Sequence, residues 1–189
     1  MLALEGSPRS SFNMLPPCVR VIRTARLEMR PFDAAHVDRF VEIQSNWKVG
    51  RMLRMANHPP TREAMLAWVE GARREWEEGT AYRFAILFED VIIGCADLDE
   101  ISGRHGELGY WLDEAFWGYG LASEAAGALR AFAFETLGLH RLESGHADDN
   151  PASGKVLTKL GFIHVGDDRQ WSKSRNVWIC QQLYRLERT

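Results

Sequence analysis

The sequence contains little cysteine, and the residues it has are widely spaced. Only three occur, Cys18, Cys95 and Cys180, and no two of them form a C-x-x-C pair. An odd number without that spacing supports neither a disulfide framework nor a zinc site. Free thiols are typical of a reducing compartment, so we expect a cytoplasmic protein that binds no metal. Cys95 lies inside an apolar run and is predicted to be a core residue.

The chain also lacks an excess of positive charge and a long apolar run. Its formal net charge is −3. Proteins that bind nucleic acids or membrane surfaces usually carry a basic excess, so we expect no partner of either kind. No stretch approaches the roughly 18 apolar residues of a membrane span. The start, MLALEGSPRSS, has an acid at Glu5 and no long apolar core, which is unlike a signal peptide.

The composition that remains is typical of a globular protein. Of the 189 residues, 46% are hydrophobic and 26% are charged, which is enough for one compact domain with a sizeable core. Residues 1–20 carry Ser, Pro, Gly and Asn with little periodicity, and we interpret them as a flexible leader. Residues 21–189 are then expected to form a single domain.

Hydrophobic periodicity predicts the elements of that domain. Alternating or continuous apolar patterns predict strands at 26–32, 82–89, 91–99, 105–113, 140–147, 162–171 and 177–186. Apolar residues at helical spacing predict helices at 34–44, 62–79, 121–137 and 151–160. The segment 45–60 follows neither pattern, so we expect it to be irregular.

The order of these elements indicates a mixed sheet. Strands joined by short turns pair antiparallel, whereas the strands on either side of the helix at 121–137 form a right-handed parallel pair. The predicted fold class is therefore α/β (α+β), a single domain with a mostly antiparallel sheet, one parallel pair and helices on both faces. The last strand, 177–186, would be an exposed edge that could pair in a homodimer.

The stretch AFWGYGLASEAA, from Ala115 to Ala126, places two glycines directly before a predicted helix. A helix N-terminus concentrates unpaired N–H groups and about half a positive charge. Gly118 and Gly120 would let a phosphate approach those amides, but a plain turn also uses glycine for its positive φ angles. The stretch matches neither G-x-G-x-x-G nor a P-loop, so taken alone it leaves both interpretations open.

The motifs around this stretch carry a family resemblance. GELGYWLDEAFWGYGLASEAA precedes NPASGKVLTKLGF, and together they resemble the Gcn5-related N-acetyltransferase (GNAT) superfamily, nearest to its RimJ/RimL-like branch. That family's coenzyme A loop reads Gln/Arg-x-x-Gly-x-Gly/Ala. Trp117 departs from the first position of this pattern, as is usual in the RimJ/RimL-like branch. The resemblance covers about residues 26–186.

The resemblance implies acetyl-CoA as cosubstrate, held where two parallel strands splay apart. The pantetheine arm would bond to the strand before the loop, and the pyrophosphate would lie on the loop amides. The cofactor-binding residues so implied are Tyr110, Trp111, Leu112, Trp117, Gly118, Tyr119, Gly120, Leu121, Ala122, Ser123, Asn150 and Ser153. The N–H of Tyr110 would also polarise the thioester carbonyl as an oxyanion donor.

Acetyl transfer to an amine needs a base, and the resemblance points to Glu107. Family members often place a glutamate near this point of the strand, where burial would have to raise its pKa. Alternatively, Glu107 faces solvent and pairs with Arg104 or a neighbouring strand. His58 and His105 are weaker base candidates, since a lone loop histidine is more often structural or solvated.

The reaction also needs an acid for the departing thiolate. Many relatives use a tyrosine seven residues after the asparagine of the second motif, but here that position holds Leu157. In the RimJ/RimL-like branch a serine takes this part, which maps to Ser153. The alternative for Ser153 is an ordinary hydroxyl in the first turn of a helix.

The resemblance implies a primary amine as acceptor, either a protein N-terminal amine or a small molecule. By family analogy the segment 45–60 and the loop SKSRN would border its pocket. Their cations, Lys48, Arg51, Arg54, Lys173 and Arg175, fit an acidic acceptor or plain solvated loops, and we favour the second. The rival hypothesis for the whole chain is a catalytically silent coenzyme A-binding module, against which the presence of Glu107 and Ser153 argues.

Overall fold

The computed structural model describes residues 21–188, so the predicted leader and Cys18 lie outside the described residues. The strands are β1 (Ile22–Arg23), β2 (Leu27–Pro31), β3 (Tyr82–Phe88), β4 (Val91–Ser102), β5 (His105–Leu112), β6 (Arg141–Ala147), β7 (Ile163–Ser172) and β8 (Val177–Glu187). The helices are α1 (Val37–Ser45), α2 (Trp47–Gly50), α3 (Arg62–Glu78), α4 (Leu121–Ala131) and α5 (Pro151–Lys159). A π-helical turn, Phe132–Thr136, continues α4.

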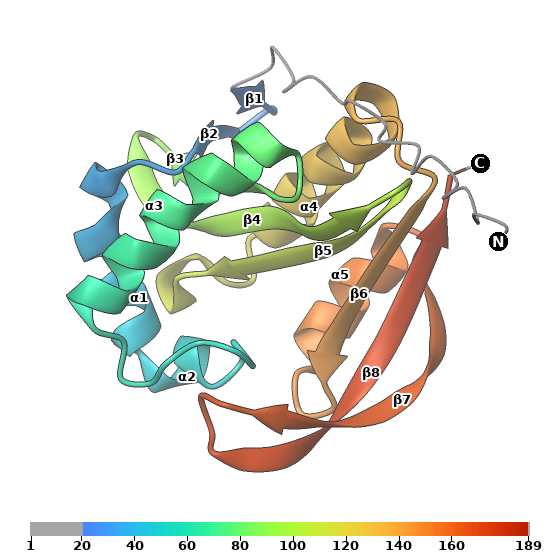
Figure 1. Ribbon diagram of the computed structural model, residues 1–189. Coiled ribbons are helices and arrows are strands. Elements are labelled where there is room, and N and C mark those ends of the chain that lie inside the picture. Colours follow the sequence, from blue (N-terminus) through green and yellow to red (C-terminus); the bar gives the residue numbers. More distant parts are fainter. Residues whose placement is uncertain (1–20, 189) are drawn as a thin grey trace, which may run out of the picture.

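The strands form one sheet in the order β1-β2-β3-β4-β5-β6-β8-β7. Among the described residues every pair is antiparallel except β5 and β6, which run parallel from His105 opposite Arg141 to Glu107 opposite Glu143. This register ends at Glu107, although β5 continues to Leu112. Figure 1 shows the two strands diverging beyond that point. The predicted mixed sheet with one splayed parallel pair is confirmed.

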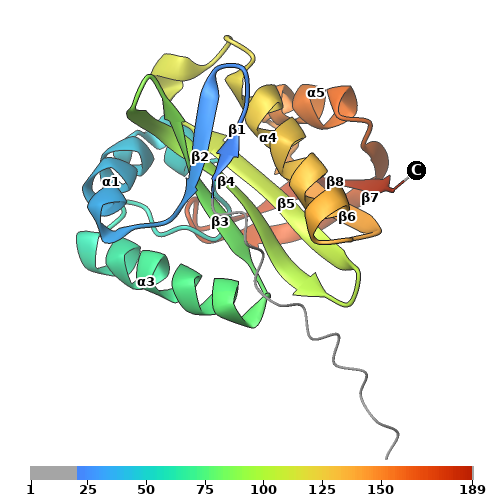
Figure 2. The same ribbon diagram turned by 90° about the horizontal axis from the view of Figure 1, so that it is seen from above.

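Helices cover both faces of the sheet, as predicted. Figure 2 shows α1 and α3 on one side and α4 and α5 on the other. The alternation of β3 explains this arrangement, because Phe84 and Ile86 belong to the core under α4, whereas Ala85 and Leu87 belong to the core under α1 and α3. A strand buried on both sides is apolar at nearly every position, as β3 is.

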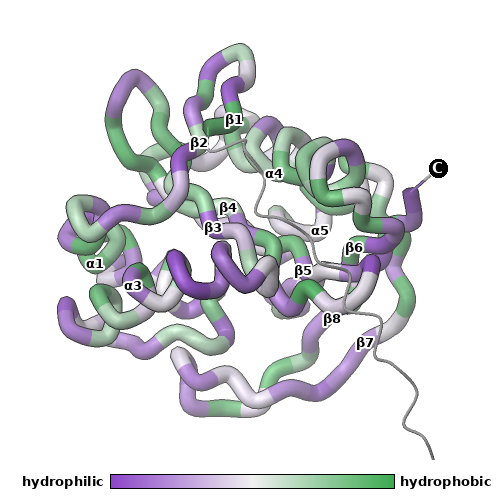
Figure 3. Tube along the Cα trace, turned by 45° about the horizontal axis from the view of Figure 1, so that its top comes forward, coloured by the Kyte–Doolittle hydropathy of each residue, from purple (hydrophilic) through white to green (hydrophobic). Residues whose placement is uncertain are grey.

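The two helical layers differ in composition. In Figure 3, α4 is coloured mainly as hydrophobic and α3 carries long hydrophilic stretches. The alanines of α4 that face the sheet, Ala125 and Ala126, are fully buried, and their small size lets this helix approach the strands closely. α3 buries a single stripe that includes Met65 and Val69 and leaves its charged face in solvent.

The prediction that strand 177–186 lies at the sheet edge is wrong. β8 lies between β6 and β7, with Arg141 opposite Glu187 on one side and Trp171 opposite Trp178 on the other. After β6, the chain passes through α5 and forms β7 one strand position away from β6. The β7–β8 hairpin then places β8 in the gap between β6 and β7. The edge strand of this end is therefore β7, and any pairing with a second copy stays a prediction that now concerns β7.

The prediction that residues 45–60 are irregular is wrong over five residues, because Ser45 ends α1 and Trp47–Gly50 form α2. The side chain of Asn46 accepts a hydrogen bond from the N–H of Lys48 at 3.0 Å and caps the short helix α2. Asparagine is a preferred N-cap, so this signal was present in the sequence. The prediction that Cys95 is a core residue is confirmed, because its side chain is fully buried.

Replacing Thr61 with alanine should lower the free energy of unfolding by about 1 kcal/mol. The Thr61 hydroxyl accepts the N–H of Ala64 at 3.2 Å and caps α3, so alanine leaves that donor without its partner. Denaturant unfolding measures the change, and Thr61→Ser, which keeps the hydroxyl, is the control. Equal stabilities of the alanine and serine variants would show that the cap contributes nothing.

Candidate active site

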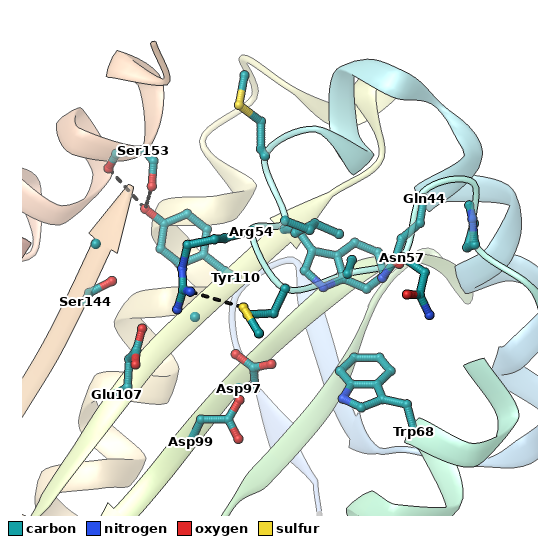
Figure 4. Close-up of a pocket in the computed structure, with 18 of the residues that line it drawn as sticks. Gln44, Arg54, Asn57, Trp68, Asp97, Asp99, Glu107, Tyr110, Ser144 and Ser153 are labelled. Carbon is teal, nitrogen blue, oxygen red and sulfur yellow. Dashed lines mark hydrogen bonds between the residues drawn. The ribbon is translucent and has the colours of Figure 1, made fainter. Parts of the chain in front are cut away.

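A cavity of about 500 Å³ lies beside the splayed strands. Its walls come from β4, β5, β6 and α3, from the segment 52–57 after α2, and from Ser153 at the start of α5. Figure 4 shows Asp97, Asp99 and Glu107 on one side of this space and the Tyr110–Ser153 pair on another. The divergence of two neighbouring strands thus leaves a hollow that polar side chains enter from several elements.

The main chain of β5 faces the diverging strand at alternate residues. The carbonyl of Leu108 points toward β6, since it accepts a hydrogen bond from Ser144 Oγ at 2.7 Å. The N–H of Asp113 donates to the Ile93 carbonyl on the β4 side. Because the main-chain groups of a strand alternate in direction, the N–H of Tyr110 points toward β6, beyond the end of the described β5–β6 register. This position suits a donor to a ligand in the splay.

The glycine turn lies at the N-terminus of α4. Gly118 and Gly120 have φ angles of 84° and 77°, a region in which other residues are strained. Gly120 is the N-cap of α4, and no side chain caps this helix end in the described residues. The first amides of α4 therefore combine unpaired donors with the positive end of the helix dipole, which is a site for an anion.

Two side chains hold this turn in place. The indole Nε1 of Trp117 donates to the Leu112 carbonyl at the end of β5, at 2.9 Å. Arg26 donates to the Tyr119 carbonyl at 3.0 Å and forms an ion pair with Glu124 in the first turn of α4. The turn is thus tied to the sheet at one end and to the N-terminal strands at the other, so its amides keep a fixed direction.

Tyr110 and Ser153 form a hydroxyl pair across the splay. Tyr110 Oη lies 2.9 Å from Ser153 Oγ and 3.1 Å from the Ser153 carbonyl oxygen. Burial raises the pKa of Tyr110 to about 12, although the hydrogen bond with Ser153 opposes this rise, so the phenol stays protonated at neutral pH. Asn150 caps α5 and accepts the N–H of Ser153 at 3.4 Å, which sets the orientation of the serine.

The carboxylates lie on the opposite face of β5 from the Tyr110 side chain. Asp99 is opposite Glu107 and Asp97 is opposite Gly109 in the β4–β5 register, so these side chains share the face that α1 and α3 cover. Burial raises the pKa of Glu107, and Glu100 adds to the effect. The predicted base thus meets the requirement of a raised pKa.

Asp97 also lines the cavity, and the sequence alone did not single it out. Burial, followed by the charge of Asp99, raises the pKa of Asp97 to about 7, against the opposing effect of Arg83. Nothing within β4 marks this aspartate, because a charged residue at that position also fits an exposed strand. The signal would have been the pairing of Asp97 with Gly109, which requires the strand register.

A buried amide completes the β6 side of the cavity. Gln181 of β8 is 8% exposed, and its Oε1 has no hydrogen-bond partner among the described residues although the residue lines the cavity. A buried acceptor without a donor costs free energy unless a ligand or water supplies one. Gln181 is therefore suited to accept an N–H from a bound molecule.

The loops predicted to border the acceptor pocket contribute unequally. Arg54 lines the cavity, and so do Met52 and Met55. Arg51 and Arg175 instead form ion pairs with Asp149. The loop SKSRN supports the cavity wall from behind, since the N–H of Lys173 donates to the Arg54 carbonyl at 2.8 Å. Lys48 pairs with Glu114, so most of these cations are neutralised within the protein.

The weaker base candidates lie elsewhere. The described residues that line the cavity include no histidine. The ring of His58 packs against Trp47 at 4.7 Å between centroids, and His105 contacts Arg141. Within residues 21–188 no cluster of three His, Cys, Asp or Glu side chains could hold a metal ion, and no helix there is long and apolar enough to cross a membrane.

The splayed parallel pair ends beside an uncapped helix N-terminus, which together can hold an extended ligand that carries an anionic group. The family model described as Acetyltransferase (GNAT) domain matches residues 26–163. The chain belongs to this family, and it is an acetyl-CoA-dependent N-acetyltransferase of the RimJ/RimL-like branch.

Curated relatives and solved structures agree with this assignment. An uncharacterised N-acetyltransferase p20 of Bacillus licheniformis is 28% identical over 89% of this chain and 96% of its own. A ribosomal-protein-serine acetyltransferase of Escherichia coli is 35% identical over 61% of this chain and 66% of its own. RimL, a ribosomal L7/L12 α-N-protein acetyltransferase in complex with coenzyme A, has the same fold, with a TM-score of 0.80 at 23% identity over 88% of this chain and 97% of that one.

Proposed function

We propose that this protein transfers the acetyl group of acetyl-CoA to the N-terminal amine of a protein, by direct attack in a ternary complex. The observation that carries the proposal is the two-sided arrangement at β5, where the Tyr110–Ser153 pair lies on one face and the carboxylates on the other. The hydroxyl pair can then protonate the leaving thiolate on one face of β5, and the carboxylates can take a proton from the amine on the other.

The cosubstrate is proposed to lie along β5 and end at the glycine turn. The pyrophosphate binds the amides of Gly118 to Ser123, a segment that includes Tyr119, Leu121 and Ala122, and the pantetheine arm passes Asn150 and the β6-facing groups of Tyr110 and Leu112. The Leu112 carbonyl already accepts from Trp117, so its N–H is the group left for the ligand. Trp111 lines the cavity, and its indole, which packs against the α1/α3 core, would touch the cosubstrate only at the acetyl end, where the two substrates meet.

The chemistry then needs no covalent enzyme intermediate. The N–H of Tyr110 donates to the thioester oxygen as negative charge grows on it. The neutral amine attacks the carbonyl carbon, the C–S bond breaks, and the thiolate takes a proton from Ser153, which Tyr110 orients. The carboxylates on the other face, with Glu107 among them, take one proton from the bound ammonium before attack, and the proton that the nitrogen loses after attack restores Ser153. Cys95 is fully buried and forms no bond in this step.

An extended acceptor is supported by the room on the carboxylate side. A second cavity of about 460 Å³ shares Asp97, Asp99, Glu107 and Gly109 with the first and continues past Arg83. A single small amine would not need both. Two relatives are named as acetyltransferases of ribosomal proteins that act on serine and alanine. The buried free thiol of Cys95 fits a cytoplasmic enzyme.

A thiol-release assay with an amine panel tests this proposal. Peptides that begin with serine or alanine should be acetylated, and the same peptides with a blocked N-terminus should not be. Spermidine and free amino acids, tested alongside, represent small acceptors, and turnover on these alone would replace the protein acceptor with a small one. Acetyl-CoA binding without turnover on any amine would instead support the silent coenzyme A-binding module.

A further inference from the structure

We propose that Asp97 is the group that takes the proton directly from the acceptor amine, and that Glu107 passes this proton on toward solvent. This assignment rests on the proposed function and adds a catalytic residue to it. It follows from where Asp97 lies relative to the Tyr110 amide.

The position of Asp97 is set by a missing side chain on the neighbouring strand. Asp97 lies opposite Gly109, and a Cβ added to Gly109 would come within 3.0 Å of Asp97 Oδ1. The carboxylate therefore occupies the space that any other residue at 109 would fill. Gly109 has no positive φ, so backbone conformation does not require glycine here, whereas the approach of Asp97 does.

Asp97 lies on the β4 side of β5, beside the residue that precedes the proposed oxyanion donor. Gly109 directly precedes Tyr110, whose N–H is the proposed donor to the thioester oxygen. Glu107 lies three residues from Tyr110 along the strand, which is roughly 10 Å at 3.3 Å per residue. An amine that attacks from the α1/α3 face thus meets Asp97 before Glu107. Figure 4 shows Asp97 directed into the cavity, with Asp99 below it.

The surroundings keep this aspartate able to accept a proton near neutral pH. The charged and titratable groups that face it are Arg83 of β3, Cys95 and Asp99 of β4, Glu107 of β5, Glu75 of α3 and Arg54 before α3. Arg83 pairs with Asp99 at 2.5 Å and with Glu75 at 3.0 Å, and lies 3.6 Å from Asp97. Burial and the neighbouring carboxylates outweigh that cation, and the pKa of Asp97 rises to about 7.

These groups account for every proton that moves in the step. The bound ammonium gives one proton to Asp97, which releases it to solvent through Glu107. The nitrogen lone pair forms the N–C bond, and the C–S bond breaks with its electrons on sulfur. Sulfur takes the Ser153 proton, and the second proton lost by the nitrogen replaces it. The products are an N-acetylated amine, free coenzyme A and one released proton.

The test compares Asp97→Asn with Glu107→Gln at saturating acetyl-CoA and a peptide with a serine N-terminus. We expect kcat at pH 8 to fall about 100-fold for Asp97→Asn and less than 10-fold for Glu107→Gln. Wild-type kcat should decrease tenfold per pH unit below about pH 7, because the protonated carboxyl accepts no further proton, and Asp97→Asn should lose that dependence. A loss of the dependence in Glu107→Gln instead would overturn the assignment.

A second set of variants displaces the Asp97 carboxylate without removing its charge. Gly109→Ala should lower kcat in the wild type and have little further effect in Asp97→Ala, where its Cβ meets no carboxylate. Gly106→Ala is the matched control on the same strand, since its Cβ meets only side-chain carbons at 3.3 Å and one carbonyl at 3.5 Å. Equal losses from Gly109→Ala in both backgrounds would contradict the proposal.

The two proposals can fail separately. Carbon-13 NMR of the labelled carboxyls, with Asp97→Asn to identify the signal, measures the titration of Asp97 without any acceptor. A midpoint near 7 supports the inference, and a midpoint near 4 overturns it. If no amine is acetylated although acetyl-CoA binds, the proposed function fails, whatever Asp97 does.

Discussion

Replacing Gly120 with aspartate should abolish acetyl-CoA binding at ordinary concentrations. Gly120 is the uncapped N-cap of α4, and its Cβ position lies 3.8 Å from the guanidinium of Arg26. An aspartate there puts a negative charge beside the proposed pyrophosphate site and competes with Glu124 for Arg26. A penalty of roughly 3 kcal/mol, reasonable for like charges this close, lowers affinity more than about 100-fold.

Two control variants separate charge from backbone strain. Gly120→Asn has nearly the same shape and the same positive φ but no charge, so it should bind acetyl-CoA far better than Gly120→Asp. Gly138→Asp places aspartate at another glycine of positive φ, 67°, whose Cβ meets nothing within 4 Å, and it should bind normally. Titration calorimetry gives the affinities. Wild-type affinity in Gly120→Asp would show that the stretch is an ordinary turn.

Removing the Tyr110–Ser153 hydroxyl pair should slow turnover about 1,000-fold, within the range for a general acid, while acetyl-CoA still binds. Ser153→Ala takes away the hydroxyl next to the leaving sulfur, and Tyr110→Phe takes away the phenol 2.9 Å from it. Because both act through one hydrogen bond, the double variant should be little slower than the slower single one.

The measurement that distinguishes this role from a structural one is the comparison of kcat with the acetyl-CoA dissociation constant. Tyr184→Phe is the control, since it removes a nearby phenol whose hydrogen bond to Gln182 is 3.4 Å long. It should keep wild-type kcat. Unchanged turnover in Ser153→Ala would remove the serine from the mechanism, and a loss of binding equal to the loss of kcat would make the pair structural.

The sequence was sufficient for the fold because its local signals agree with one another. β3 is apolar on both faces, Thr61 and Asn150 cap helices α3 and α5, and Gly79 ends α3 in the left-handed conformation. The misplaced edge strand shows the limit of such signals. The pairing of β8 with β6 is a contact between segments distant in sequence, and alternation along a strand does not specify its neighbour.

The site was predicted in part for the same reason. The glycine turn, Asn150 and Ser153 lie in local motifs, so their placement at helix N-termini could be predicted. The hydroxyl contact of Tyr110 with Ser153 joins residues 43 positions apart, and the approach of Asp97 to Gly109 depends on the β4–β5 register. Both contacts arise only when the sheet is assembled.

The separation of hydroxyl and carboxylate groups by β5 has a consequence for the kinetics of the two substrates. If acetyl-CoA and the acceptor reach the splay from opposite faces of one strand, neither blocks the entry of the other. Free coenzyme A would then compete with acetyl-CoA and leave the peptide bound. The acetylated peptide would compete with its own precursor alone, so each product inhibits only the substrate that shares its face.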